Sequence, residues 1–209
     1  MKPISSGLLA LLYVLGASSL VLAASSTELS VTGLITPSAC TTTLSANGIV
    51  DHGKVPAHTL NQYELKDLPT QELGLEVSCN QPVLFVLVGM DNRADSSLGP
   101  GFYYGLGTNT HAPLERLGIV SLTIGEVTAD NQPLRVLASS NQGETWFPEP
   151  TAYPNNYMGF ASPGTLVPEP YRVVNATLQI NTSINAATYL TLKQEVPLDG
   201  SIMLDLRYL

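Results

Sequence analysis

The distribution of apolar and polar residues along the chain predicts an all-β protein. Short runs of β-branched and aromatic residues alternate with Gly, Pro, Asn and Asp, and helical periodicity is hard to find beyond the N-terminal region. Turn signals such as Asn47-Gly48 and Asp199-Gly200 separate these runs. Many short strands with regular turns predict a β-sandwich. We expect strands over residues 28–35, 73–79, 83–89, 117–127, 134–139, 171–180, 188–196 and 201–209.

Two stretches in the middle of the chain depart from this pattern. Residues 91–104 are rich in Gly, Ser, Asn and Asp, and residues 147–170 are rich in Pro and aromatic residues. Because proline cannot donate a hydrogen bond to a ladder, we expect residues 147–170 to contain no central strand. The region around residues 91–170 is therefore interpreted as a Gly/Pro-rich insertion of long ordered loops and edge strands.

The N-terminal region predicts export. Lys2 is the only charged residue before Glu28, and residues 7–23 are apolar or small. Val21-Leu22-Ala23 fits the small-residue pattern of a signal-peptidase site. The apolar run is short for a membrane span and lacks a basic stop-transfer flank. We expect residues 1–23 to be a signal peptide and the protein to be exported to the periplasm.

The cysteines and the net charge indicate whether a disulfide, a metal site or a nucleic-acid partner is expected. An even cysteine count in an exported protein favours a disulfide, here between Cys40 and Cys79. The alternatives are two free thiols or half of a metal site. No metal site is expected, because His52, His58 and His111 show no ligand spacing. A net charge of −8 with scattered basic residues argues against a nucleic-acid partner.

The sequence carries no catalytic or cofactor motif that we can identify. GxSxG, HExxH, P-loop and CxxC patterns are absent, and nothing pairs the acidic residues Asp91, Glu144 and Glu149. We therefore expect a protein that is not an enzyme and that uses no cofactor. The aromatic residues of the proline-rich stretch could stack on a sugar, although such residues more often pin a loop to its own sheet. They are Tyr153, Tyr157 and Phe160.

In the segments at both ends of the proposed mature chain, residue types alternate with a period of two. Ahead of the first cysteine, Leu29, Val31, Gly33 and Ile35 alternate with Glu28, Ser30, Thr32 and Leu34. At the C-terminus, Met203, Asp205 and Arg207 alternate with Ile202, Leu204, Leu206 and Tyr208. A period-two strand buries one face, and a strand at the end of the chain is followed by no other. The chain is thus expected to begin with a free strand and to end with one that lacks a neighbour.

These features resemble the chaperone–usher pilin superfamily. Gly33 lies seven residues before Cys40, the stretch GIVDHG at residues 48–53 fits G-x-(V/I)-x-x-G, and Tyr208 is the penultimate residue. The middle and the end look closer to the beta-fimbrial major-subunit-like proteins, whose shared domain has no assigned function. The likeness is strong over residues 28–80, fair over the last ten and weak between. In two respects the chain departs from pilins: Val196 stands where they usually have glycine, and the mature chain is longer.

The resemblance implies an immunoglobulin-like β-sandwich over residues 37–209 that lacks its last strand. Residues 24–36 would be an N-terminal extension that acts as a donor strand in the next subunit. The inserted side would be Leu29, Val31, Gly33 and Ile35. The groove and its edge would be formed by Ile202, Leu204, Leu206 and Tyr208.

The function that the resemblance implies is that of a structural subunit of a bacterial surface fimbria, contributing to cell adhesion. The implied partners are a periplasmic pilus chaperone, an outer-membrane usher and neighbouring pilin subunits, and the implied destination is the cell surface. Other interpretations stay open. Residues 28–35 could be the first strand of a closed sandwich, and the protein could be a monomeric secreted or periplasmic binding protein for a carbohydrate or protein ligand. A hydrolase is the most distant alternative.

Overall fold

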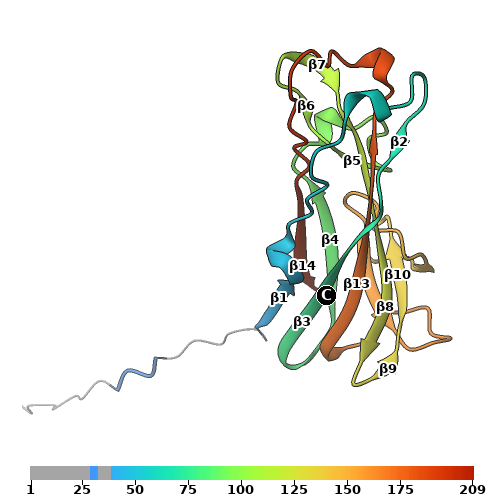
Figure 1. The fold of residues 1–209 in the computed structure, drawn as a ribbon. Coiled ribbons are helices and arrows are strands. Elements are labelled where there is room, and N and C mark those ends of the chain that lie inside the picture. Colours follow the sequence, from blue (N-terminus) through green and yellow to red (C-terminus); the bar gives the residue numbers. More distant parts are fainter. Residues whose placement is uncertain (1–28, 33–38) are drawn as a thin grey trace, which may run out of the picture. The chain divides into compact units, whose positions relative to one another are not determined.

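The computed structural model describes residues 29–32 and 39–209 (Figure 1). The chain divides into two units, Met1–Ile35 and Thr36–Leu209. The described part of the second unit is all-β, as the sequence predicts, with antiparallel sheets arranged as a sandwich. Its helical segments are short 3-10 turns at Ser45–Gly48 (η1), Ala57–Thr59 (η2), Ala94–Ser96 (η3) and Ala187–Tyr189 (η4).

The first sheet places β1 at one edge. Its strand order is β1-β3-β13-β8-β5, formed by Cys40–Leu44 (β1), Gln71–Val83 (β3), Tyr171–Ile184 (β13), Gly118–Ala129 (β8) and Tyr104–Gly105 (β5). Two short strands extend it, Lys66–Asp67 (β2) beside β13 and Gln132–Pro133 (β9) beside β8. The strict alternation of buried and exposed residues along β3 shows that one face of this sheet covers the core.

The second sheet places the C-terminal strand at its edge. Its order is β11-β10-β12-β4-β14, formed by Phe147–Pro148 (β11), Arg135–Ser139 (β10), Tyr157–Ala161 (β12), Phe85–Asp91 (β4) and Ile202–Tyr208 (β14). A separate hairpin joins Thr108–Asn109 (β6) to Ala112–Arg116 (β7). Among the described residues, β14 has a single neighbour, β4.

The core lies between the two sheets. Phe85 of β4 and Phe160 of β12 pack with their ring centroids 5.8 Å apart. They face a layer of buried aliphatic residues from the first sheet, including Val77, Ile124 and Val174. No buried side-chain nitrogen or oxygen in the described part of the chain lacks a hydrogen-bond partner.

Two sequence-based expectations are wrong. The stretch of residues 147–170 contains β12, which is the central strand of the second sheet. Pro154 and Pro163 flank this strand instead of interrupting it, so its five residues keep their ladder donors. The strand expected over residues 188–196 is absent, and this stretch is a 3-10 turn followed by irregular chain.

The region that we interpreted as an insertion contributes to both sheets. Residues 91–170 supply β8 to the first sheet and both β10 and β12 to the second. None of the described residues forms a helix with the length and hydropathy that a membrane span requires.

Candidate functional site

The disulfide fixes the strand that forms one side of the candidate site. Cys40 and Cys79 are bonded, as the sequence predicts, and their Cα atoms lie 4.0 Å apart. They are direct partners in the antiparallel ladder of β1 and β3. The Asn80 N–H donates to the Ala39 carbonyl, so the cysteine pair next to it is a non-hydrogen-bonded pair. At such pairs the side chains come closest, which suits a cross-strand disulfide.

The outer edge of β14 has no partner strand among the described residues. Just outside the strand, the Asn92 N–H donates to the Ser201 carbonyl, and the Leu209 N–H donates to the Leu84 carbonyl. Because hydrogen-bonded positions alternate in an antiparallel ladder, the odd-numbered residues of β14 bond to β4. The backbone N–H and C=O groups of the even-numbered residues therefore point away from β4. These residues are Ile202, Leu204, Leu206 and Tyr208.

The edges of β1 and β14 approach each other at one end. The Cys40 N–H donates to the Tyr208 hydroxyl over 3.0 Å. The same alternation that places Ala39 against β3 turns the Cys40 N–H toward the outer edge of β1. The penultimate tyrosine thus bridges the two sheets where the C-terminal strand ends.

An apolar groove opens between the two sheets on this side of the sandwich. Its volume is about 1230 Å³. Its floor comes from β8 and β13, and its sides come from β1, β14 and two irregular segments, residues 48–57 and 190–200. The apolar lining residues are Leu44, Val50, Val55, Leu60, Leu73, Leu106, Leu117, Val120, Leu122, Leu178, Ile180, Ile184, Leu190, Leu192, Val196, Leu198, Ile202 and Leu204.

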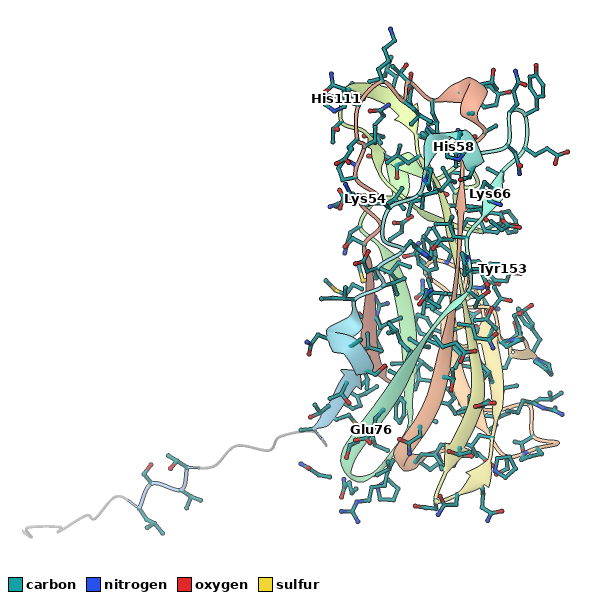
Figure 2. All side chains as sticks on the ribbon, viewed as in Figure 1. Lys54, His58, Lys66, Glu76, His111 and Tyr153 are labelled. Atoms are coloured by element: carbon teal, nitrogen blue, oxygen red, sulfur yellow. A yellow bond between two sulfur atoms is a disulfide. The ribbon has the colours of Figure 1, made fainter. Side chains whose placement is uncertain are left out.

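The two irregular segments border the groove from opposite sides. In Figure 1 the dark red chain of the 190–200 segment descends to β14, beside the chain of the 48–57 segment that leads away from η1. Lys54 Nζ and Glu195 Oε1 join the segments by an ion pair of 2.8 Å, and both side chains are 88% exposed. Figure 2 labels Lys54 at this position. Since exposed ion pairs stabilise little, the position of each segment is fixed mainly by its other contacts with the fold.

The 190–200 segment is anchored at both ends to other parts of the fold. Glu115 of β7 accepts hydrogen bonds from the Thr191 N–H at 2.6 Å and from the Thr191 hydroxyl at 2.7 Å. These bonds hold the pKa of the Glu115 carboxyl below its usual value. At the other end, Arg93 makes two hydrogen bonds to the Asp199 carboxylate, which lower the pKa of Asp199. The segment is therefore irregular but fixed.

One polar contact lies within the apolar lining. His52 Nε2 lies 3.0 Å from the hydroxyl oxygen of Thr182, a residue of β13 that is 3% exposed. Both residues line the groove. The contact ties the 48–57 segment to the floor and satisfies the buried hydroxyl.

The structure divides the predicted groove residues of β14 between two environments. Ile202 and Leu204 line the groove. Leu206 is half-buried and packs against the core, and Tyr208 is 43% exposed apart from its hydrogen bond to Cys40. Leu206 and Tyr208 thus do not line this groove.

The predicted donor residues are only partly within the described chain. Leu29 and Val31 are 86% and 88% exposed, and residues 29–32 belong to no strand. Gly33 and Ile35 lie outside the described residues.

The aromatic residues that could have stacked on a sugar do not form a common platform. Phe160 is buried in the core, and Tyr157 packs under the Arg207 guanidinium at 5.6 Å from its ring centroid. Tyr153 makes an edge contact with Phe102 at 6.1 Å. Phe160 and Tyr157 belong to β12, and only Tyr153 lies in a loop, which its contact with Phe102 holds.

The acidic residues considered for a hydrolase also have structural partners. Asp91 accepts hydrogen bonds from the N–H groups of Arg93 and Gly105, and Glu149 accepts one from the Thr151 N–H. Residues 29–32 and 39–209 contain no group of three or more His, Cys, Asp or Glu residues that could hold a metal ion.

Comparison with known proteins matches part of this chain to a protein family. Residues 29–111 match the family described as "Protein of unknown function (DUF1120)", which covers β1, β3 and β4 and less than half of the chain. The matched residues include both cysteines, the 48–57 segment and Leu29 and Val31.

Two proteins of Escherichia coli strain K12 are similar over most of their length. Protein GltF is 25% identical over 249 aligned residues, which span 98% of this chain and 97% of that protein. The uncharacterized protein YhcF is 24% identical over 206 aligned residues, 82% of this chain and 85% of that protein. The chain is thus similar, at low identity, to whole proteins of about its own extent.

Proposed function

We propose that the protein is a structural subunit of a bacterial surface fimbria, assembled by donor-strand complementation. The observation that carries the proposal is the apolar groove of about 1230 Å³ beside an unpaired strand edge. Exposed edges and apolar hollows promote association with other chains, so proteins cover them. A β-strand from another chain covers both at once, because its backbone bonds to the edge and its side chains fill the groove.

The N-terminal extension, residues 24–36, is the strand that we propose for this role. Leu29 and Val31 are almost fully exposed, and Gly33 and Ile35 continue the same face of an extended chain. Each aliphatic side chain that becomes fully buried contributes about 1.5–3 kcal/mol, and main-chain hydrogen bonds add to this. Gly33 would pass where the groove is shallow, because a residue without Cβ allows the closest approach.

Under this proposal the sandwich is a pilin-type immunoglobulin-like fold without its last strand. The cross-strand disulfide at the start of β1 and the C-terminal strand at a sheet edge support it. A periplasmic chaperone would cover the groove first, an outer-membrane usher would mediate the exchange, and the fibre would contribute to adhesion at the cell surface. The role is structural and requires no catalysis.

The test is whether the mature protein forms chains of subunits that resist SDS. Protein recovered from the cell surface should run as a ladder when it is not boiled and as one band after boiling. The Gly33→Val variant should assemble far more slowly, since its added methyl groups lie where two backbones must approach. Thr32→Val, which places the same side chain on the opposite face, should assemble normally. A Gly33→Val protein that assembles at the normal rate, or an unboiled monomer only, would contradict the proposal.

A further inference from the structure

We infer that the edge offered to an incoming strand does not end at β14 but continues through residues 192–198, which become a strand when the groove is filled. The inference rests on the proposed function. The occupant is the N-terminal extension, residues 24–36, of a second copy of this chain.

The position of the groove is the first argument. Of the seven residues of β14, only Ile202 and Leu204 line it. Most of the lining on this side comes from the 190–200 segment, which faces the floor residues Ile180 and Ile184 of β13. A strand that fills the groove therefore has to run along this segment and not only along β14.

The two residues that anchor the segment, Thr191 and Asp199, are odd-numbered, as are the residues of β14 that bond to β4. The Thr191 N–H donates to Glu115, and the Asp199 N–H donates to the Leu106 carbonyl. Within the described part of the chain, residues 192–198 take part in no backbone–backbone hydrogen bond, so both edges of this stretch are unpaired. When the parity of its two anchors and of β14 is carried through the stretch, the even-numbered positions continue the free edge of β14 as far as residue 192.

The apolar side chains of the segment fall on its even-numbered positions. Leu192, Val196 and Leu198 are half-buried in the groove, whereas Lys193, Glu195 and Pro197 are exposed. The even-numbered Gln194 is exposed as well, because the chain bends at residues 193–194. Proline is tolerated at residue 197 because its nitrogen stands at an odd position, where the outer edge needs no donor. Apart from this bend, the segment has the apolar alternation of a strand, and among the described residues no second strand pairs with it.

The length of the extension fits this longer edge. The seven residues of β14 span about 24 Å at ~3.4 Å per residue. The thirteen residues of the extension reach about 43 Å when extended at ~3.3 Å per residue. The extension is thus much longer than β14 and long enough to pair with residues of the 192–198 stretch as well. The exposed Lys54–Glu195 pair at the mouth gives little resistance to its entry.

Amide hydrogen exchange followed by mass spectrometry tests the inference directly. The full mature chain is measured alone and with an excess of a synthetic peptide of residues 24–36. Protection should rise in peptides that cover residues 192–198 and in those that cover β14. Protection of β14 alone would overturn the inference while leaving the proposed function in place. If the peptide neither binds nor protects any segment, both are wrong.

A pair of adjacent proline variants provides a matched control. Gln194→Pro removes an N–H that we place on the free edge, whereas Lys193→Pro removes one on the opposite side, as Pro197 does in the native chain. Both side chains are exposed, so we expect thermal unfolding to change little. Gln194→Pro should weaken peptide binding about tenfold, the equivalent of one main-chain hydrogen bond with its local distortion, and Lys193→Pro less than about twofold. Equal affinities of the two variants would overturn the inference. If either variant misfolds, the hydrogen-exchange result on the parent protein decides instead.

Discussion

At the scale of single residues, close contacts under β4 position the strand edge that borders the groove. Gly89 of β4 is the ladder partner of Leu204, which lines the groove. A Cβ atom on Gly89 would lie 2.0 Å from the hydroxyl oxygen of Tyr104. Tyr104 is fully buried and donates a hydrogen bond of 2.7 Å to the Ala152 carbonyl. Burial raises the pKa of its phenol, so the hydroxyl remains a donor at ordinary pH.

We therefore predict that Gly89→Ala destabilises the protein by about 1–3 kcal/mol, since the new methyl group overlaps the Tyr104 hydroxyl. The measurement is the free energy of unfolding from urea denaturation. Tyr104→Phe removes the overlapping oxygen, so the double variant should be more stable than the sum of the two single changes predicts. Additive effects would show that this contact does not limit the size of residue 89.

The disulfide between Cys40 and Cys79 is a second feature that depends on single residues. Sequence reasoning paired Cys40 with Cys79 from the even count alone, and the structure confirms the bond. For a separation of 39 residues the chain-entropy relation gives a stabilisation of about 4 kcal/mol. Its contact with Tyr208 through the Cys40 N–H could not be read from the sequence, because 168 residues separate the two.

At the scale of elements, the groove depends on two segments that are irregular and yet fixed. The run of β-forming residues at 188–196 predicts a strand, whereas the structure has a 3-10 turn followed by irregular chain, and no described strand pairs with it. The segment is instead held by side chains, notably Glu115 on Thr191 and Arg93 on Asp199. The β-forming composition of this segment thus did not predict its irregular backbone.

This anchoring predicts a loss of stability in acid. The pKa of Glu115 is lower in the folded protein than its ordinary value of 4.5, and that of Asp199 is lower than 3.8. Such carboxylates stabilise the fold fully above their unfolded pKa, and this contribution disappears as the pH falls through the folded pKa. Unfolding free energy should therefore decline as the pH falls below about 4.5.

The contribution of Glu115 can be isolated with Glu115→Gln. The variant should be less stable than the parent at pH 7, and the difference should shrink as the pH falls below 4.5, where the parent carboxylate becomes protonated. The measurement is urea denaturation at a series of pH values. Glu76→Gln, at an exposed position of β3 that Figure 2 labels, serves as the control and should follow the parent. A constant difference between Glu115→Gln and the parent at all pH values would contradict this assignment.

At the scale of the whole molecule, the segment before β1 and the C-terminal strand have the properties that the proposed donor and acceptor strands require. One end supplies an alternating segment whose Leu29 and Val31 are exposed, and the other ends in a strand with one free edge. Because the extension precedes β1, its removal should leave the core of the sandwich intact.

We predict that deletion of residues 24–34 gives a subunit that folds but ends fibres. It retains the groove and can accept a donor strand, and it has no strand to donate. Co-expressed with the parent chain, it should shorten the SDS-resistant ladder in proportion to its amount. Misfolding and degradation of the deleted subunit would instead show that the extension belongs to its own core.

The sequence by itself determined the fold class, the disulfide and the alternating apolar residues of the C-terminal strand. These follow from local quantities: the runs of β-forming residues, the period of two in β14, the turn residues between strands, and the cysteine count. The central place of β12 could not be predicted in this way, because prolines beside a strand and prolines within it have similar effects on composition.

Only the tertiary structure decided where the groove lies and what forms it. Val120 and Ile180 lie in its floor, and Val50 and Leu192 lie in its sides. No sequence pattern indicates that these residues line one groove. The anchors of its sides, His52 on Thr182 and Glu115 on Thr191, are pairs of ordinary polar residues far apart in the chain. The alternation of a segment determines which of its faces is apolar. Which other segment packs against that face depends on the packing of the whole chain and cannot be derived from one segment alone.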